Sequence, residues 1–134
     1  MALKYHRDLF RMAVCDMAKS SDKFSARLRS AWLNYLYRIH WDELEAALLE
    51  EDLPIFKRLK KHLYEDLMNR IQTEKMLVME QTANAPRPLS EEQASKYANA
   101  GSVIMAMNGH RAKNIICLIV DFYSTINQTI EYKR

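Results

Sequence analysis

The chain has 134 residues and a formal net charge of +3, and it contains only two glycines, three prolines and two cysteines. This length fits one domain of common size. Two glycines cannot supply the spacings of the known phosphate-binding loops, and two cysteines cannot form a disulfide framework or a zinc ribbon. Low Gly and Pro with abundant helix-forming residues predict an all-α fold, a compact bundle of five or six helices.

The location of the protein is predicted from its apolar segments. The longest unbroken apolar run covers residues 115–120, whereas a membrane-spanning helix needs about 20 apolar residues. Near the N-terminus, Lys4, Arg7 and Asp8 stand where a signal peptide would need an apolar stretch. We therefore expect a cytoplasmic protein that does not bind membranes. Cys15 and Cys117 both lie among apolar residues, so we expect them to be buried, reduced thiols.

Helical spacing of apolar residues predicts the first three helices, over 2–19, 22–40 and 41–51. Ser20 or Ser21 is the expected N-cap of the second. A fourth helix is predicted to run to residue 81, with Asp52 as its cap and Pro54 in its first turn. Its apolar residues repeat every fourth position between 55 and 71, so the stripe drifts around the helix axis.

The C-terminal part is predicted to form a helical hairpin. Residues 82–89 (TANAPRPL) read as an extended, proline-containing linker, and residues 90–93 (SEEQ) read as a capping box. The next helix, 91–107, carries the small residues Ala94, Ala98 and Gly101 and should end at Asn108 and Gly109. An Asn-Gly pair also favours a β-hairpin, but sixteen residues of helical spacing predict a last helix over 110–132.

These segments form one domain, with a helical unit at 1–81, the linker at 82–89 and the hairpin at 90–134. Twelve apolar residues at helical spacing are the predicted core: Phe10, Phe24, Leu28, Trp32, Tyr35, Ile39, Leu59, Leu63, Ile115, Ile119, Phe122 and Ile126. Polar residues also fall within apolar arcs. His6 and Asp16 do so in the first helix, and Asp66 with Arg70 is predicted to form an internal ion pair in the fourth.

Catalytic chemistry is not indicated by the sequence. His40 shares a helix face with Glu43, and His62 shares one with Glu65 and Asp66, but the paired Glu and His ligands of a di-iron bundle are missing. Neither cysteine and no serine lies in a known nucleophile motif. We therefore expect no enzyme activity, no metal and no cofactor.

Charge is unevenly distributed along the chain. Residues 41–52 contain six acidic and no basic residues, and residues 53–61 contain four basic and no acidic ones. Helix capping explains several of these acids but not Glu45 or Glu50, which an antiparallel turn could place near Lys57 and Lys61. The basic candidates fall on three predicted helices: Lys23, Arg27 and Arg38 on the second, Lys57, Arg58 and Lys61 on the fourth, and Arg111 and Lys113 on the last.

Two functions follow as predictions. The first is a non-catalytic protein-binding adaptor, regulator or inhibitor, because the second helix has a second apolar stripe and the charge is segregated. Large aromatic residues dominate interface energetics, so the candidates are the stripe residues Leu33, Tyr37 and Trp41 together with Glu45 and Glu50. The same stripe could instead lie in the core or form a homodimer seam. The alternative is a nucleic-acid-binding regulator that uses the three basic groups.

Overall fold

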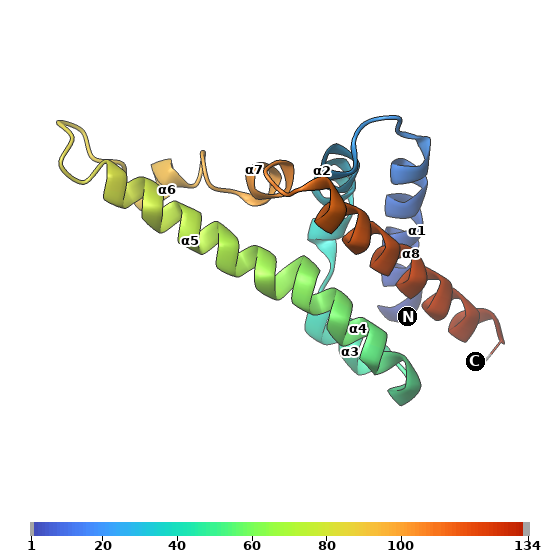
Figure 1. The fold of residues 1–134 in the computed structure, drawn as a ribbon. Helices are drawn as coiled ribbons and strands as arrows, with labels where there is room; N and C mark the ends of the chain where they lie inside the picture. Colours follow the sequence, from blue (N-terminus) through green and yellow to red (C-terminus); the bar gives the residue numbers. More distant parts are fainter. Residues whose placement is uncertain (1, 133–134) are drawn as a thin grey trace.

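The computed structural model describes residues 2–132 and is built from helices throughout (Figure 1). This confirms the predicted all-α fold, and within the described residues there is no strand, so the β-hairpin alternative is wrong. The helices are α1 (Ala2–Lys19), α2 (Phe24–Asn34), α3 (Trp41–Ala47), α4 (Leu53–Lys60), α5 (Asp66–Gln81), α6 (Glu91–Ala94), α7 (Ala100–Met105) and α8 (Gly109–Tyr132). No helix in this part of the chain is both long and apolar enough to cross a membrane.

The core lies where α1, α2, α4 and α8 pack against one another. Its centre is aromatic: the Phe122 ring on α8 lies 5.1 Å from the Phe10 ring on α1 and 5.9 Å from the Phe56 ring on α4. Ten of the twelve predicted core residues are buried, and Phe24 and Tyr35 are partly buried against the same core. Offset and edge-to-face aromatic pairs of this kind stabilise beyond their buried area.

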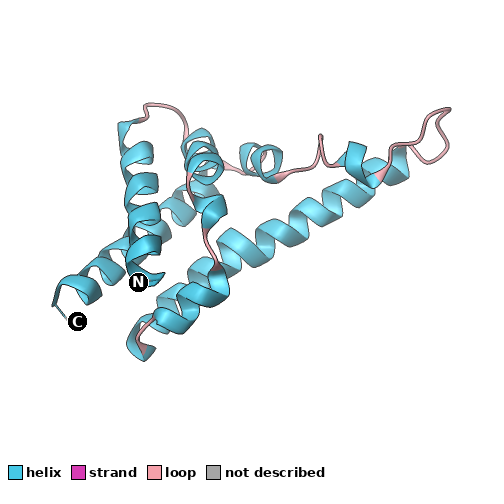
Figure 2. Cartoon of the chain, turned by 180° about the vertical axis from the view of Figure 1, so that it is seen from behind, coloured by secondary structure: helices cyan, strands magenta, loops and turns pink. Residues whose placement is uncertain are grey.

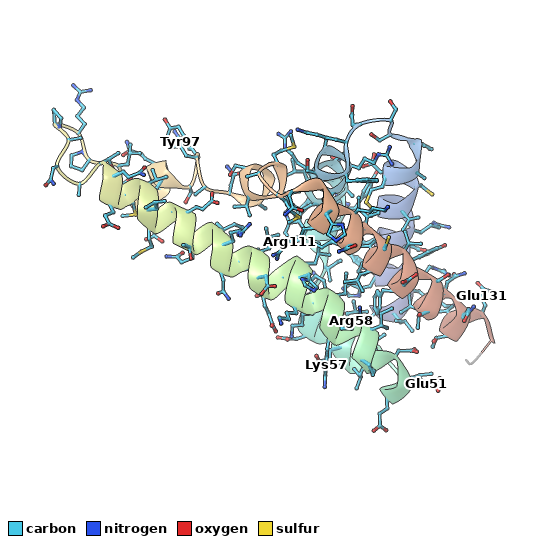
Figure 3. All side chains as sticks on the ribbon, in the orientation of Figure 1. Glu51, Lys57, Arg58, Tyr97, Arg111 and Glu131 are labelled. Carbon is cyan, nitrogen blue, oxygen red and sulfur yellow. The ribbon has the colours of Figure 1, made fainter. Side chains whose placement is uncertain are left out.

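Helix α1 is tied to the far end of α8 by polar contacts at the edge of this core. The Arg7 guanidinium donates to the Asn127 side chain at 3.0 Å and lies 3.7 Å from the Glu131 carboxylate. Glu131 is near the end of α8 in Figure 3. The two ends of the described chain therefore lie on the same side of the molecule (Figure 1).

Helices α4 and α5 form one continuous rod that leaves the core as an arm (Figure 1). The two are joined by a π-helical turn, Lys61–Glu65, and not by a break. Apolar residues at every fourth position advance about 40° too far per step on an α-helix. A π turn holds an extra residue per hydrogen-bonded turn, which offsets part of this drift and keeps Leu59, Leu63 and Leu67 buried on one side. Beyond Leu67 no residue of α5 is fully buried.

Residues 82–89 form the tip of the arm, far from both chain ends (Figure 2). The predicted linker is thus a loop, closed at its base because the Leu89 amide donates to the Thr82 hydroxyl at 3.2 Å. The chain then runs back along α5 as α6. Ser90 and Gln93 form the predicted capping box, with bonds of 3.2 and 3.0 Å.

The prediction of a single helix over 91–107 is wrong, because α6 ends at Ala94 and a separate helix, α7, begins at Ala100. Asn99 causes the restart: its side chain accepts from the Ser102 amide at 3.0 Å, and the Ser102 hydroxyl accepts from the Asn99 amide. The row of small residues still serves close packing. Ala94, Ala98 and Gly101 are buried, and a Cβ on Gly101 would lie 3.7 Å from Leu33 on α2.

The second helix is also shorter than predicted, ending at Asn34 instead of residue 40. A 3-10 turn, Leu36–Arg38, and two extended residues carry the chain to α3, which itself ends at Ala47 and not at residue 51. His6 on α1 is the polar partner at this break. Its ring Nδ1 donates to the Ala2 carbonyl at 2.7 Å, and its Nε2 accepts from the His40 amide at 3.2 Å.

Three predicted caps differ in the structure. Residue 23, not Ser20 or Ser21, precedes α2. Asp52 precedes α4, but its side chain makes no capping bond and is instead buried, accepting from the Thr129 hydroxyl at 2.8 Å. Asn108 caps the start of α8 and not the end of the preceding helix, because its side chain accepts from the Arg111 amide at 2.8 Å.

Candidate functional site

A concave pocket lies between the α4–α5 rod and the N-terminal half of α8. We call it the α8 pocket; its volume is about 450 Å³. Ile115 and Leu118, both nearly fully buried, provide apolar lining, and the remaining lining residues are mostly polar. The residues around the pocket are Arg58, His62, Asn108, His110, Arg111, Asn114, Ile115, Cys117, Leu118 and Asp121.

Local structure places the two walls. On the rod, Arg58 lies on α4 and His62 lies in the π turn, beside the buried Leu63. Segments of π-helix are frequent at functional sites, because they shift the register of the side chains that follow. On the other wall, the Asn108 cap fixes the first turn of α8 and so the direction of Arg111. Figure 3 shows Arg111 in the angle between α8 and the rod.

Asp66 on α5 contacts one residue of each wall. One carboxylate oxygen of Asp66 lies 3.6 Å from Nδ1 of His62 and 3.6 Å from an Nη atom of Arg111. Both distances exceed those of a good hydrogen bond, so the contacts are mainly electrostatic. Arg70 is exposed. The predicted Asp66–Arg70 ion pair is therefore wrong, and Asp66 serves the pocket instead.

Two polar atoms at this pocket are buried without a hydrogen-bond partner. They are Nδ1 of His62 and Nε of Arg111. No other buried side-chain nitrogen or oxygen among the described residues lacks a hydrogen-bond partner. A buried donor left unpaired is costly, and native proteins hold few of them. The pocket thus presents hydrogen-bonding capacity that the protein itself does not use.

A second cationic group adjoins the first turn of α8. The Arg27 guanidinium lies 5.4 Å and the Lys113 ammonium 5.9 Å from the centre of the Phe24 ring. Lys23 and Arg27 also line a hollow that reaches Gly109. We call Lys23, Phe24, Arg27 and Lys113 the Phe24 cluster. Basic residues predicted on the second, fourth and last helices thus meet around the start of α8.

The remaining basic candidates lie elsewhere. Arg38 donates to the Tyr37 hydroxyl at 3.1 Å and stacks on that ring. Lys57 and Lys61 are exposed, and Lys57 points away from α8 (Figure 3). The structure therefore places Arg58 and Arg111 at the α8 pocket and Lys23, Arg27 and Lys113 around Phe24.

The apolar stripe predicted on the second helix is divided. Leu33 and Tyr37 are exposed, but Trp41 is only 7% exposed and packs about 6 Å from the rings of Phe56 and Tyr64. Trp41 is thus a core residue. Tyr97, at 65% exposure, is a more open aromatic side chain that the sequence pattern did not single out (Figure 3).

Of the two acidic candidates, Glu45 is screened by a different lysine from those predicted. Lys60 lies 4.0 Å from Glu45 and 3.8 Å from Asp42, whereas we expected Lys57 and Lys61. Glu50 is exposed in the 3-10 turn before α4.

Both cysteines are exposed, so the prediction of buried thiols is wrong. Each lies on the outer flank of an amphipathic helix, where neighbours in the sequence are apolar but point inward. Cys117 lies on the rim of the α8 pocket.

Among the described residues no three His, Cys, Asp or Glu side chains are placed to hold a metal ion. Anion binding is the chemistry that the pocket residues support.

Sequence reasoning named Arg58 and Arg111 as basic residues but did not find the pocket that they share. The candidate site residues did not include His62, Asn108, Asn114 or Cys117, because a site between two helices has no signal in either helix alone.

In comparisons with known proteins, no family model, no curated protein and no solved structure matches this chain.

Proposed function

We propose that this protein is a non-catalytic adaptor, regulator or inhibitor that binds another protein, and that the surface around the start of α8 contacts an acidic segment of that partner. One observation supports this most directly. Cationic side chains from α2, α4 and α8 gather on the two sides of one helical turn, where polar atoms are left unpaired. Electrostatic complementarity of this kind speeds association and selects the partner.

An acidic protein segment fits this surface better than a nucleic-acid backbone does. A backbone presents regularly spaced phosphates and needs a continuous row of cations. Here Asp22, Asp66 and Asp121 lie within or beside the cationic groups and interrupt any such row. A concave pocket instead admits one anionic side chain, and the exposed Lys and Arg residues around it can pair with its neighbours.

The test compares two variants of equal charge. Arg58→Gln with Arg111→Gln removes the cations of the α8 pocket, and Lys57→Gln with Arg70→Gln removes two exposed cations that lie outside it. Each protein is immobilised and used to capture binding proteins from a nuclease-treated extract of the native host, followed by mass spectrometry. We expect the wild type and the Lys57/Arg70 variant to retain the same partner and the pocket variant to lose it.

Salt provides a second readout, since contacts between exposed charges weaken as ionic strength rises. Capture should fall steeply between low and moderate salt. If the pocket variant and the Lys57/Arg70 variant captured the partner equally well, the proposed surface would be wrong.

A second candidate function is a nucleic-acid-binding regulator. It is favoured by the Phe24 cluster, where an aromatic ring carries two cations beside the α8 pocket. The three cations of this cluster, Lys23, Arg27 and Lys113, would give a slope of about −2.7 when the logarithm of duplex affinity is plotted against the logarithm of salt concentration. A gel-shift series on generic DNA and RNA measures it, and no shift at low salt would exclude this function.

A further inference from the structure

We propose that the α8 pocket binds a single phosphate group, either as free inorganic phosphate or as the monoester of a phosphorylated side chain of the partner. This inference deepens the proposed function and rests on it for its biological setting, although the site itself is tested on the isolated protein. Three features of the site bear on its ligand: the donors on both walls, the two unpaired atoms and the position of Asp66.

The walls offer donors from opposite directions. Arg58 and His62 project from the rod, and Arg111, with the side-chain amide of Asn114, projects from α8. A tetrahedral oxyanion has oxygens on all sides and can accept from both walls at once, whereas a planar carboxylate presents two oxygens in one plane. Arginine is the residue that recognises phosphate with paired hydrogen bonds.

The unpaired atoms indicate what is missing. Nε of Arg111 is buried and donates to no group of the described chain, and Nδ1 of His62 is buried without a hydrogen bond as well. Both belong to side chains that also have exposed atoms, at 36% and 40% exposure. A ligand can therefore reach the exposed atoms of these side chains from the pocket, whereas Nε of Arg111 and Nδ1 of His62 are themselves covered.

Asp66 acts as an internal counter-ion that a ligand must outcompete. It lies 3.6 Å from both Arg111 and His62, too far for good hydrogen bonds but close enough to neutralise part of the Arg111 charge. A carboxylate ligand carries the same single charge as Asp66 and would gain little. A phosphate monoester carries about −1.5 to −2 at neutral pH and three acceptor oxygens, so it can compete.

The other acid of the pocket lies at the far end from Arg111. Asp121 follows Arg111 by ten residues on the same helix, which corresponds to a separation of about 15 Å. It therefore repels a phosphate held beside Arg111 only weakly. His110 stands in the first turn of α8, next to Arg111.

Cys117 provides a direct probe because it is exposed on the rim of the pocket. In a Cys15→Ser protein, the rate of thiol labelling is measured with inorganic phosphate and with chloride at matched ionic strength. We expect phosphate to slow labelling of Cys117 in a saturable manner. The matched control is the Cys117→Ser protein, in which Cys15 on α1 should label at the same rate in both salts.

Variants identify the groups that bind. Arg111→Gln should weaken phosphate binding about tenfold or more, as expected for a lost charge-assisted hydrogen bond. Asp66→Asn should tighten it about two- to fivefold, because the competing charge is removed. Arg70→Gln should leave it unchanged. Circular dichroism confirms that each variant is folded, and the gain in Asp66→Asn cannot be produced by misfolding.

Peptide arms distinguish the source of the phosphate. A phosphoserine peptide, its glutamate analogue and inorganic phosphate are compared by titration calorimetry. Binding of the phosphopeptide and of inorganic phosphate, but not of the glutamate peptide, is the expected result. Equal labelling of Cys117 in phosphate and chloride, together with no gain in Asp66→Asn, would overturn the inference. The pull-down with the Arg58/Arg111 variant is independent of these measurements, so failure of the phosphate site and failure of the proposed function remain distinguishable.

Discussion

The buried hydrogen bond between Thr129 and Asp52 joins the end of α8 to the start of α4, and its removal should be costly. Thr129 is fully buried and Asp52 is 3% exposed. The Thr129 hydroxyl lies 2.8 Å from the Asp52 carboxylate and 3.1 Å from the Thr125 carbonyl. A hydroxyl has one proton to donate. The Asp52 carboxylate is the nearer and the stronger of the two acceptors, so the Thr129 hydroxyl donates to it. Thr129→Val keeps the shape of the side chain but removes this donor.

We expect Thr129→Val to lower the free energy of unfolding by about 1.5–3 kcal/mol, the cost of losing a hydrogen bond to a buried charged group. For a chain of this size, 1 kcal/mol corresponds to about 3.5 °C in Tm. The expected fall in Tm is therefore about 5–11 °C. Differential scanning calorimetry and urea unfolding both measure it.

The control is Thr125→Val on the same helix. The Thr125 hydroxyl donates to the Asp121 carbonyl of its own helix at 2.9 Å, and Thr and Val have similar helix propensities. This variant should change stability by less than about 0.5 kcal/mol. A double-mutant cycle with Asp52→Leu should give an interaction free energy of about 1 kcal/mol or more. Equal Tm values for the two threonine variants would refute the reasoning.

Three further predictions concern stability. Burial lowers the pKa of His6 below its ordinary value of 6.5, so the unfolded state binds more protons than the folded state does. Stability should therefore fall as the pH drops through and below 6.5. In His6→Gln, the midpoint of urea unfolding should depend less steeply on pH across this range. Trp41→Ala should cost about 3–5 kcal/mol because it empties a core position, whereas Tyr37→Ala should cost less than about 0.5 kcal/mol, both by urea unfolding. Gly109→Ala should raise stability by about 0.4–1 kcal/mol in a thermal melt, because its Cβ would meet nothing within 4 Å.

Each of these has a contradicting result. An unchanged pH slope in the His6 variant would mean that His6 is not the group responsible. Similar losses for Trp41→Ala and Tyr37→Ala would mean that the aromatic stripe is not divided between core and surface. A destabilised Gly109→Ala would indicate that α8 needs glycine at its first position.

The sequence predicted the helices best where apolar spacing and a local cap agreed. Helices α1 and α8 lie within a residue of their predicted bounds, and the Ser90 capping box forms as expected. Two boundaries failed for different reasons. The α-helix ends at Asn34, a few residues before His40, whose amide donates to His6 on another helix. The 91–107 helix divides because a local capping box between Asn99 and Ser102, which the sequence analysis did not identify, starts a new helix.

The candidate site was predicted only in its parts. Arg58 and Arg111 are recognisable as basic residues, but they lie 53 positions apart in the sequence, and only the packing of α8 against the rod brings them to one pocket. The π turn that places His62 has no simple sequence signal beyond the four-residue repeat, which is equally compatible with a straight α-helix. Asp66 was assigned to Arg70, four residues later, whereas it contacts His62, four residues earlier, and Arg111 on another helix, a partner that the sequence does not show.

The sequence by itself determined that the chain is all-α and which apolar faces form its core, because helix propensity and periodicity are local properties. The tertiary structure alone decided which charges meet, which aromatic residues are covered and which buried atoms stay unpaired. Those properties depend on the angles and contacts between helices. Of the six acidic residues in 41–52, Asp42 and Glu45 contact Lys60 and Asp52 is buried against Thr129, a division that no pattern within the segment specifies.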